Sequence, residues 1–427
     1  MEKARKKGGS RVKRERRFRT GIWMAASLAM LWAASVCAAD GVPVGFVVPL
    51  TNSSADIGKQ IKLGATLAAD EINRTGGLSS LGGAPLKLIF ADSETNPSIG
   101  YSETERLILR EQVSVLCGAY NSQITFPAIK VAERYKTPWV VNSAAMDEIT
   151  EQGFKYIFRP CNSALFDAKE QFDAIEHFSR ETGKKPRTVG LVYQSTDWGH
   201  AQAKNIRRLA VERGYFLIVD KAHPDKQLDF SPILAQVRER NPDLLIVALY
   251  TDDHVRFSKA MMKERIDVPF GIHSIGAGSE DPLFYQSAPR ASVDYMFVQE
   301  DWPADRSALR EKILGLNQKF KDGLGSSINA YGAQGYSNVW LIHDALNRSG
   351  SNDREKIRNA LAKTDITAGP ALVTGYQRIT FDPKGQNAHA HGVVSQNQKG
   401  DRIPLWPQDN RPQGAKPVWP VPSWDQR

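Results

Sequence analysis

Short apolar segments alternate with amphipathic segments along most of the chain. The segment 42–50, VPVGFVVPL, is rich in β-branched residues, and after it apolar residues recur every three or four positions from Ile57 to Ile72. The first pattern predicts a strand, and the second predicts a helix with one buried face. Because the strand segments are continuously apolar, both faces of each strand must be covered. The alternation therefore predicts an α/β protein in which helices cover parallel sheets.

The same alternation continues through the following 200 or so residues. Further strands are predicted at 85–92, 113–118, 138–142, 188–193, 215–219, 243–250 and 269–272, and further helices at 98–111, 126–135, 200–213, 230–240, 253–265, 304–320 and 329–348. Two batches of about five strands each indicate two sheets, with a break near Phe158. The tail from Pro404 to Arg427 is too rich in proline for regular structure, and its tryptophans predict that it packs across a surface.

The N-terminus combines a basic head with an apolar segment. The first twenty residues hold ten Lys or Arg against Glu2 and Glu15, which is +8 of the net charge of +9. The remainder is nearly neutral, which argues against a nucleic-acid partner. Residues 21–39 are uncharged and end in small residues, so 1–39 is predicted to be a signal peptide cleaved near Ala39, with the periplasm as the destination. An uncleaved or lipid anchor is the alternative.

Enzyme signatures are absent from the sequence. It contains no G-x-S-x-G elbow, no Walker A loop, no G-x-G-x-x-G after a strand and no C-x-x-C. Only His389 and His391 lie close together, and two ligands without a third do not make a zinc site. We therefore expect no catalysis, cofactor or metal. Cys117 and Cys161 could form one disulfide, although Cys117 ends a predicted buried strand, where a free thiol is common.

Eight sequence motifs occur in one order between about Val44 and about Val394. They are VVPLTNSSADIGKQIKLGATLAADEINRTGG, PLKLIFADSETNP, CGAYNSQITFPA, PWVVNSAAMDEIT, GFKYIFRP, VGLVYQSTDWG, NPDLLIVALYTDD and INAYGAQGYSNVWLIHDAL. In this order they resemble the type I periplasmic substrate-binding proteins of ABC importers, in the branched-chain amino acid and amide group. The resemblance implies two doubly wound parallel-sheet lobes, joined by a three-crossover hinge, that close on one small molecule.

The resemblance also implies how the chain is divided between the lobes. Lobe one would comprise 40–159 and 301–378, and lobe two would comprise 160–300 and 379–427. The crossovers would lie near Phe158, Val298 and Ile379. A member of this family is expected to be a monomeric receptor that hands its ligand to permease subunits in the membrane. The same fold serves sensory proteins, but the transmembrane helix or signalling domain of that class is not expected here.

Ligand contacts in the first lobe follow from the same resemblance. Ser122, after the strand at 113–118, matches a serine that hydrogen-bonds the carboxylate of the ligand. A helix N-terminus at this point would favour an anion, and the alternative role for Ser122 is a helix cap. Ser143, Ala144 and Ala145 match a loop that contributes mostly backbone contacts. Ala145 lacks the hydroxyl of the threonine that family members often place there.

Aromatic side chains match the walls of the family's cleft. They are Trp198, Tyr250 and Tyr331, and each could instead be ordinary packing.

Two departures from the family's pattern bear on the ligand. The acid that holds an α-ammonium should fall near Ser274, so either Asp252 or Glu280 takes this role or the ligand has no ammonium. Ile57 stands where a cleft-lining tyrosine is often found, which makes that wall more apolar. The first expectation for the ligand is a small carboxylate-bearing solute, namely an apolar amino acid. An aromatic or aliphatic carboxylic acid or an amide is the second.

Overall fold

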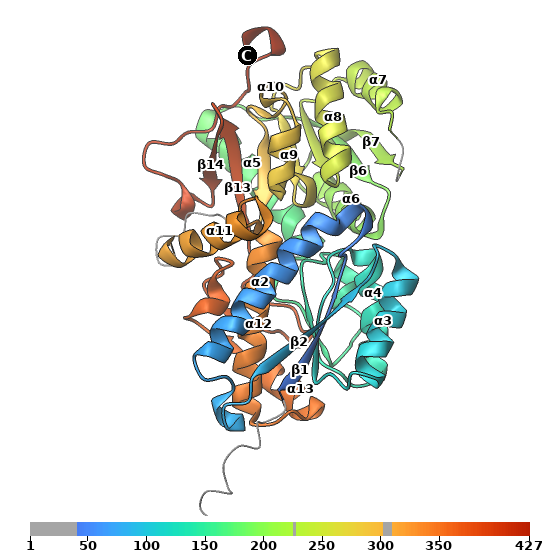
Figure 1. Ribbon diagram of the computed structural model, residues 1–427. Helices are drawn as coiled ribbons and strands as arrows, with labels where there is room; N and C mark the ends of the chain where they lie inside the picture. Colours follow the sequence, from blue (N-terminus) through green and yellow to red (C-terminus); the bar gives the residue numbers. More distant parts are fainter. Residues whose placement is uncertain (1–40, 225–227, 302–309) are drawn as a thin grey trace, which may run out of the picture.

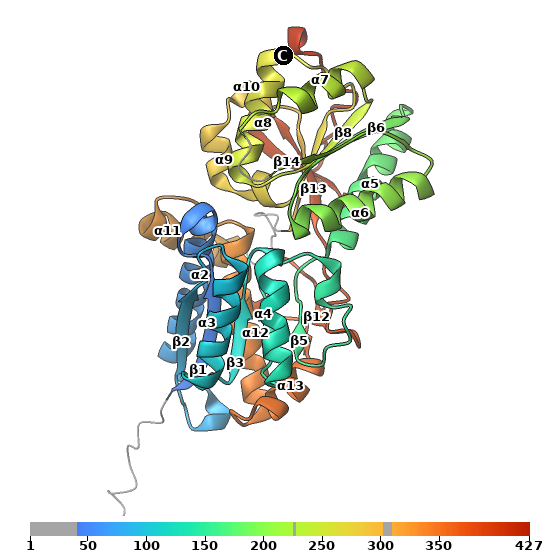
Figure 2. The same ribbon diagram turned by 90° about the vertical axis from the view of Figure 1, so that its right-hand side faces the viewer.

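The computed structural model describes residues 41–224, 228–301 and 310–427, so the predicted signal peptide lies outside it. Its elements form two lobes, one above the other in Figures 1 and 2, and each lobe contains one large sheet covered by helices. This arrangement confirms the predicted two-sheet α/β fold. No helix within the described ranges is long and apolar enough to cross a membrane.

The sheet of the first lobe is entirely parallel, in the order β2-β1-β3-β4-β5. Its strands are β1 (Val42–Val48), β2 (Leu86–Asp92), β3 (Val115–Gly118), β4 (Trp139–Val141) and β5 (Ile157–Phe158). Its main helices are α2 (Ala55–Arg74), α3 (Pro97–Leu109), α4 (Ser122–Arg134), α12 (Ala330–Ser349) and α13 (Arg354–Ala362). Helices α2 and α12 pack against one face of the sheet, and α3 and α4 pack against the other.

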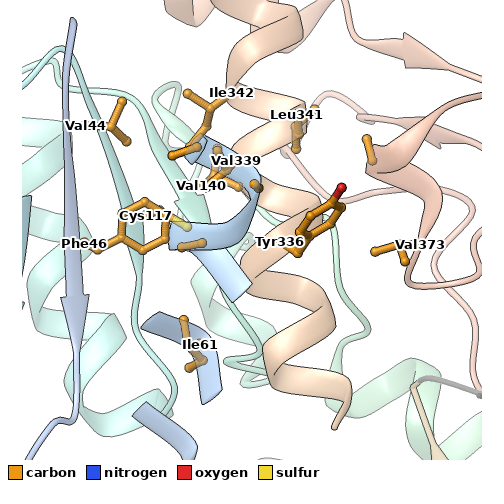
Figure 3. Packing of buried hydrophobic residues seen from close by; sticks show 14 of the residues in the cluster. Val44, Phe46, Ile61, Cys117, Val140, Tyr336, Val339, Leu341, Ile342 and Val373 are labelled. Atoms are coloured by element: carbon orange, nitrogen blue, oxygen red, sulfur yellow. The ribbon is translucent and has the colours of Figure 1, made fainter. Parts of the chain in front are cut away.

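The core of the first lobe lies between this sheet and α12 (Figure 3). Phe46 of β1 and Val140 of β4 are fully buried in one cluster with Val339 of α12. The backbones of α2 and α12 touch, because a Cβ on Gly64 would lie 2.1 Å from the carbonyl oxygen of Gly332. This contact holds the start of α12, where Tyr331 lies.

The sheet of the second lobe has seven strands in the order β14-β13-β10-β9-β8-β6-β7. They are β6 (Thr188–Gln194), β7 (Phe216–His223), β8 (Leu244–Ala248), β9 (Ile272–Ile275), β10 (Phe297–Glu300), β13 (Val393–Gln398) and β14 (Asp401–Trp406). Strands β7, β6, β8, β9 and β10 are neighbours in this order and run parallel to one another. Strands β13 and β14 form an antiparallel hairpin at one edge. Its helices are α5 (Ala164–Thr182), α6 (Asp197–Glu212), α7 (Ser231–Arg240), α8 (Thr251–Glu264), α9 (Pro282–Ser287) and α10 (Arg290–Val293).

Both faces of this second sheet are also covered, with α5 and α6 on one face and α7, α8 and α9 on the other. After β10 the chain returns to the first lobe, where α11 (Arg310–Leu324) packs Phe320 into the core. A short antiparallel pair, β11 (Asp365–Ile366) and β12 (Ile379–Thr380), precedes the return to β13.

Several elements differ from the sequence prediction, among them α5 and β9 of the second lobe. The 19-residue helix α5 was not predicted, although Ser163 caps its start by accepting a hydrogen bond from Phe166 N, and left-handed Gly183 ends it. Strand β9 begins at Ile272, where the predicted strand 269–272 ends, because Gly271 adopts a positive φ of 82° that only a turn accommodates well.

The proline-rich tail behaves partly as predicted. Pro404 lies inside β14, which contradicts the expectation of no regular structure from that residue onward. Proline is tolerated there because β14 is the edge strand and its outer side needs no N–H donor. Beyond it the tail does pack across the second lobe: Trp419 is buried, its Nε1 donates to the carbonyl oxygen of Lys184 at 2.8 Å, and Trp424 Nε1 donates to Ile266 O at 2.8 Å.

Candidate ligand-binding pocket

A pocket lies between the two lobes. Its lining residues are Tyr120, Ser143, Ala145, Asp167, Trp198, Tyr250, Gly276, Ala277, Glu280, Gln299, Asp301 and Tyr331. Several of them lie one or two residues after a strand, as Ser143 does after β4, Tyr250 after β8 and Gly276 after β9. Ligands of open parallel sheets bind beyond these carboxyl ends. The pocket encloses about 380 Å³ free of protein atoms, part of it open to solvent.

Four aromatic rings form a continuous wall across both lobes. The rings of Trp198 and Tyr250 stack with centroids 5.0 Å apart, and Tyr120 meets Tyr331 edge-on at 4.9 Å. Tyr120 and Tyr250, 6.0 Å apart, join the two pairs. The Tyr331 hydroxyl also donates to Ala277 O of the opposite lobe at 3.5 Å. This wall suits the apolar part of a ligand.

Three carboxyl groups face the same pocket. Glu280 Oε1 accepts a hydrogen bond from Asp301 N at 2.6 Å, and Asp301 Oδ1 accepts one from Asn162 Nδ2 at 3.0 Å. Asp167 Oδ2 accepts one from Gln202 Nε2 at 2.7 Å. Burial, and to a smaller extent repulsion from Asp301, raises the pKa of Asp167 and of Glu280 well above the usual range. Burial also raises the pKa of Asp301 to about 6.

Gln299 connects this group to a fourth acid behind the wall. Its Nε2 donates to Asp167 Oδ1 at 3.3 Å and to Glu170 Oε2 at 3.2 Å. Its Oε1 is buried and has no hydrogen-bond partner among the residues described. Glu170 Oε1 accepts from Gly392 N at 2.7 Å, and burial raises the pKa of Glu170 to about 8. The pocket wall therefore carries an unused acceptor beside its carboxylates.

No basic side chain balances these acids on the pocket wall. Within the described ranges, none of the lining residues is Lys, Arg or His. The nearby Glu300 differs, because Arg402 Nη1 lies 2.7 Å from its Oε2 in a mostly buried ion pair. Arg402 also attracts Glu280 through space, and buried Arg159 attracts Asp167, but within the described ranges neither forms a direct ion pair with an acid that lines the pocket.

The predicted first-lobe contact Ser122 is close to the pocket but does not line it. Helix α4 begins at Ser122 instead of the predicted Phe126, and its N-cap is Asn121, so the alternative of Ser122 as the cap is wrong. The side chain of Ser122 is buried, and its Oγ accepts a hydrogen bond from Met146 N at 3.3 Å. A position at the strand-to-helix junction was predictable, whereas the direction of this hydroxyl was not.

The loop after β4 contributes two of its three predicted residues to the wall, namely Ser143 and Ala145. The Ser143 hydroxyl already donates to Gln334 Oε1 and accepts from Asn142 Nδ2. Ala144 lies in the core of the first lobe. The Ala145 carbonyl accepts from Ala164 N of α5 at 2.7 Å, which joins this loop to the second lobe.

The structure separates the candidate acids of the second lobe. Ser274 is buried on β9 and its hydroxyl donates to Ser279 Oγ at 2.7 Å, so it does not line the pocket. Asp252 is exposed in the first turn of α8 and is also absent from the lining, whereas Glu280 belongs to it. Ile57 is buried in the core of the first lobe instead of lining the pocket.

Sequence reasoning missed four functional candidates: Tyr120, Asp167, Gln299 and Asp301. Tyr120 carried a usable signal, because it directly follows a predicted strand. Asp167 could not be found without helix α5, in whose first turn it lies.

The two cysteines are both free and buried, so the possible disulfide between Cys117 and Cys161 is not formed. Burial raises the pKa of the Cys161 thiol to about 12, and this thiol is therefore protonated at neutral pH. Among the residues that the structure describes, no group of three His, Cys, Asp or Glu side chains could hold a metal ion.

Comparison with known proteins gives a consistent result. A family model described as "Periplasmic binding protein" matches residues 41–401. The Leu/Ile/Val-binding protein homolog 8 of Brucella melitensis is 26% identical over 385 residues, which cover 86% of this chain and 91% of that protein.

Two solved structures illustrate the range of ligands found on this fold. LivJ, a branched-chain amino acid transporter substrate binding protein from Streptococcus pneumoniae, was solved with isoleucine; it has a TM-score of 0.71 and 20% identity, covering 85% of this chain and 98% of that one. A solute binding protein from R. palustris, solved with benzoate, also has a TM-score of 0.71, with 17% identity over 86% of this chain and 95% of that one. Because the family model matches most of the chain and the fold agrees, the chain belongs to the periplasmic binding protein family.

Proposed function

We propose that this protein is the exported receptor of an ABC importer and that it captures a small solute bearing an amino group between its lobes. One observation carries the proposal: the pocket wall is drawn from strand ends of both sheets and combines four aromatic rings with three carboxyl groups. Such a wall suits an apolar body and an ammonium group. An apolar amino acid is the candidate that the names of the relatives suggest, and an apolar amine suits the same wall.

The predicted organic-acid ligand is less well supported. An anion such as benzoate would lie beside Asp167, Glu280 and Asp301, would be repelled by each of these groups that is ionised, and would raise their pKa values further. An uncharged amide would escape this repulsion but would leave the acids without a cation. The pocket therefore favours a ligand with an amino group over either alternative.

Closure of the lobes about the crossovers is part of the proposal, with the lobe boundaries at 159/160, 300/301 and 378/379. Buried Arg159, at the first crossover, supports it: its Nε donates to Gln386 Oε1 at 2.5 Å, and its Nη1 donates to Met146 O at 2.6 Å. The bond to Gln386 joins the first and third crossovers, so the two can bend together, and the bond to Met146 anchors Arg159 in the first lobe.

Export and transfer to a membrane permease complete the proposal. The uncharged segment 21–39 after a basic head supports secretion to the periplasm, and family membership supports delivery to an importer.

Native mass spectrometry of the purified protein, followed by thermal-shift measurements, tests the receptor role. A ligand bound only to the native state must raise the melting temperature. Leucine, isoleucine, valine, phenylalanine and their amine and acid analogues form the panel. If no compound raises the melting temperature and no ligand mass is retained, the receptor proposal fails.

A further inference from the structure

We propose that the pocket selects an organic cation, namely an apolar amine that carries no carboxylate. This inference rests on the proposed function, since it specifies the ligand of the same pocket. Four separate features of the described residues support it: the charge of the wall, the type of hydrogen-bonding group on it, the aromatic rings and the first-lobe hydroxyls.

The first feature is an excess of acids. Asp167, Glu280 and Asp301 line the pocket, and the lining residues that the structure describes include no base. Burial favours the protonated forms of Asp167 and Glu280 in the empty pocket, and a bound cation would lower the pKa of both groups and favour their ionised forms. A zwitterionic amino acid adds no net positive charge, whereas an amine adds one and a diamine adds two. The acidic wall therefore favours a ligand with a net positive charge.

The second feature is that neutral groups hold these carboxylates in place without neutralising them. Gln202 Nε2 donates to Asp167, and Asn162 Nδ2 and Gln334 Nε2 donate to Asp301. Gln299 Oε1, 1% exposed as a residue, has no partner in the described part of the chain. Ionised carboxylates and this amide oxygen are acceptors, so a donor such as an ammonium group suits this side of the pocket.

The third feature is the aromatic wall. The rings of Tyr120, Trp198, Tyr250 and Tyr331 lie next to the acidic group and on the same pocket. Their π faces attract cations as well as apolar surface. An amine with an aliphatic or aryl body satisfies both parts of the pocket.

The fourth feature is the lack of a side-chain site for a carboxylate in the first lobe. The Ser143 hydroxyl donates to Gln334 Oε1, Ser122 lies behind the wall with its Oγ at Met146 N, and Ala145 has no hydroxyl. Backbone N–H groups at the start of α4 are the remaining donors for an anion. A carboxylate on the ligand thus gains little from side chains while it adds repulsion with the acids.

The test compares matched compounds on the same purified protein by isothermal titration calorimetry. The first set is leucine, 3-methylbutylamine, which lacks the carboxylate, and 4-methylpentanoic acid, which lacks the amine. The second set is phenylalanine, 2-phenylethylamine and 3-phenylpropionic acid, with 1,5-diaminopentane as a dication. We expect at least one amine to bind about ten-fold more tightly than its amino acid, which corresponds to about 1.4 kcal/mol.

The outcomes separate this inference from the receptor proposal. If an amino acid binds more tightly than its amine, the inference is wrong and the receptor proposal stands. If only the two carboxylic acids bind, the pocket recognises an anion, and both the inference and the proposed amino group of the ligand are wrong. If nothing binds and native mass spectrometry finds no retained ligand, the receptor proposal fails as well.

Single neutral substitutions locate the cation site. We expect Glu280→Gln and Asp167→Asn each to weaken amine binding by about ten-fold or more, because a charged partner is lost. The melting temperature without ligand should change little, since burial already favours the protonated, uncharged forms of both acids. Asp252→Asn, an exposed acid of the same lobe, is the control and should change neither quantity. Unchanged amine affinity in both variants would overturn the inference.

Discussion

The two lobes share one architecture and meet at one pocket, yet they bring different chemistry to it. The first lobe contributes Tyr120, Tyr331, Ala145 and Ser143, whose hydroxyl donates to Gln334. The second lobe contributes two aromatic rings as well, but it also contributes the carboxyl groups of Asp167 and Glu280, and Asp301 joins them from the crossover. Equivalent strand ends therefore do not imply equivalent roles: both lobes offer aromatic surface, whereas the acids come from the second lobe and the crossover.

Reversing one charge in the second lobe should have the largest effect. Glu280→Lys puts an ammonium group where we propose that the ligand's amine lies, so amine binding should fall by more than about 100-fold through like-charge repulsion. Calorimetry with 3-methylbutylamine measures the loss. Asp252→Lys makes the same charge change on an exposed site of this lobe and should have little effect. A similar loss in both variants would mean that long-range charge, not the pocket, attracts the amine.

Removal of a ring from the aromatic wall should have the next largest effect on binding. Each lobe contributes two rings to this wall. Trp198→Ala and Tyr331→Ala, one from each lobe, should each weaken binding by about 1 to 3 kcal/mol through lost apolar and cation–π contact. Titration of the same amine gives both values. Tyr331→Phe keeps the ring, removes only the hydroxyl and is the matched control. A loss confined to one lobe would contradict a shared wall.

The pH dependence of the free energy of unfolding should arise from the buried acids and not from the aromatic wall. Burial raises the pKa of Glu170 to about 8 and that of Asp301 to about 6, so the native state retains protons that the unfolded chain has released. The stability that these two groups contribute is therefore full below about pH 4 and falls as pH rises to about 8, by at most about 1.4 kcal/mol per pH unit for each group. Urea unfolding without ligand at several pH values measures this slope.

Glu170→Gln should flatten the upper part of that slope. Amine binding should show the opposite trend and strengthen as pH rises, because the cation pairs with the ionised carboxylates. Among the described residues, Glu170 faces Asp167, Asp173, Asp301 and Tyr376. It accepts hydrogen bonds from Asn162, Gln299 and the backbone N–H of Gly392, and none of these groups is a base that could reverse the sign. An unchanged slope in the variant would assign the pH effect to other groups.

The first-lobe hydroxyls should matter least for binding. Ser122→Ala and Ser143→Ala should each change amine affinity by less than about three-fold, while each lowers the free energy of unfolding by about 1 kcal/mol for a lost hydrogen bond. Calorimetry and urea unfolding separate the two effects. A ten-fold loss for Ser122→Ala would show that its hydroxyl reaches the ligand, as the family's pattern implied.

The fold was predictable because its signals are local and repeated. Continuous apolar runs such as 42–50 must be buried on both faces, and one-sided helical stripes such as the one from Ile57 to Ile72 must cover them. Trp198, Tyr250 and Tyr331 could be proposed for the pocket because they lie at strand or helix ends. Their position on one wall agrees with that reasoning, and their role in binding stays a prediction.

The acidic group was not predictable in the same way. Asp167, Glu280 and Asp301 come from a helix that was not predicted, a turn after β9 and a crossover. Nothing local distinguishes Glu280, which lines the pocket, from Asp252, which faces solvent. Only packing between distant segments separates them.

By itself, the sequence determined the α/β class, the division into two sheets and the strand-end location of a pocket, because hydrophobic periodicity and strand order depend on the burial of near neighbours. The tertiary structure alone decided the character of that pocket. In that structure Ser122 lies outside the pocket lining, and Ser143 donates a hydrogen bond to Gln334. Asp167, Glu280 and Asp301 line one pocket, and the described lining includes no base. These are properties of side-chain direction and long-range contact, and the pocket's charge depends on them.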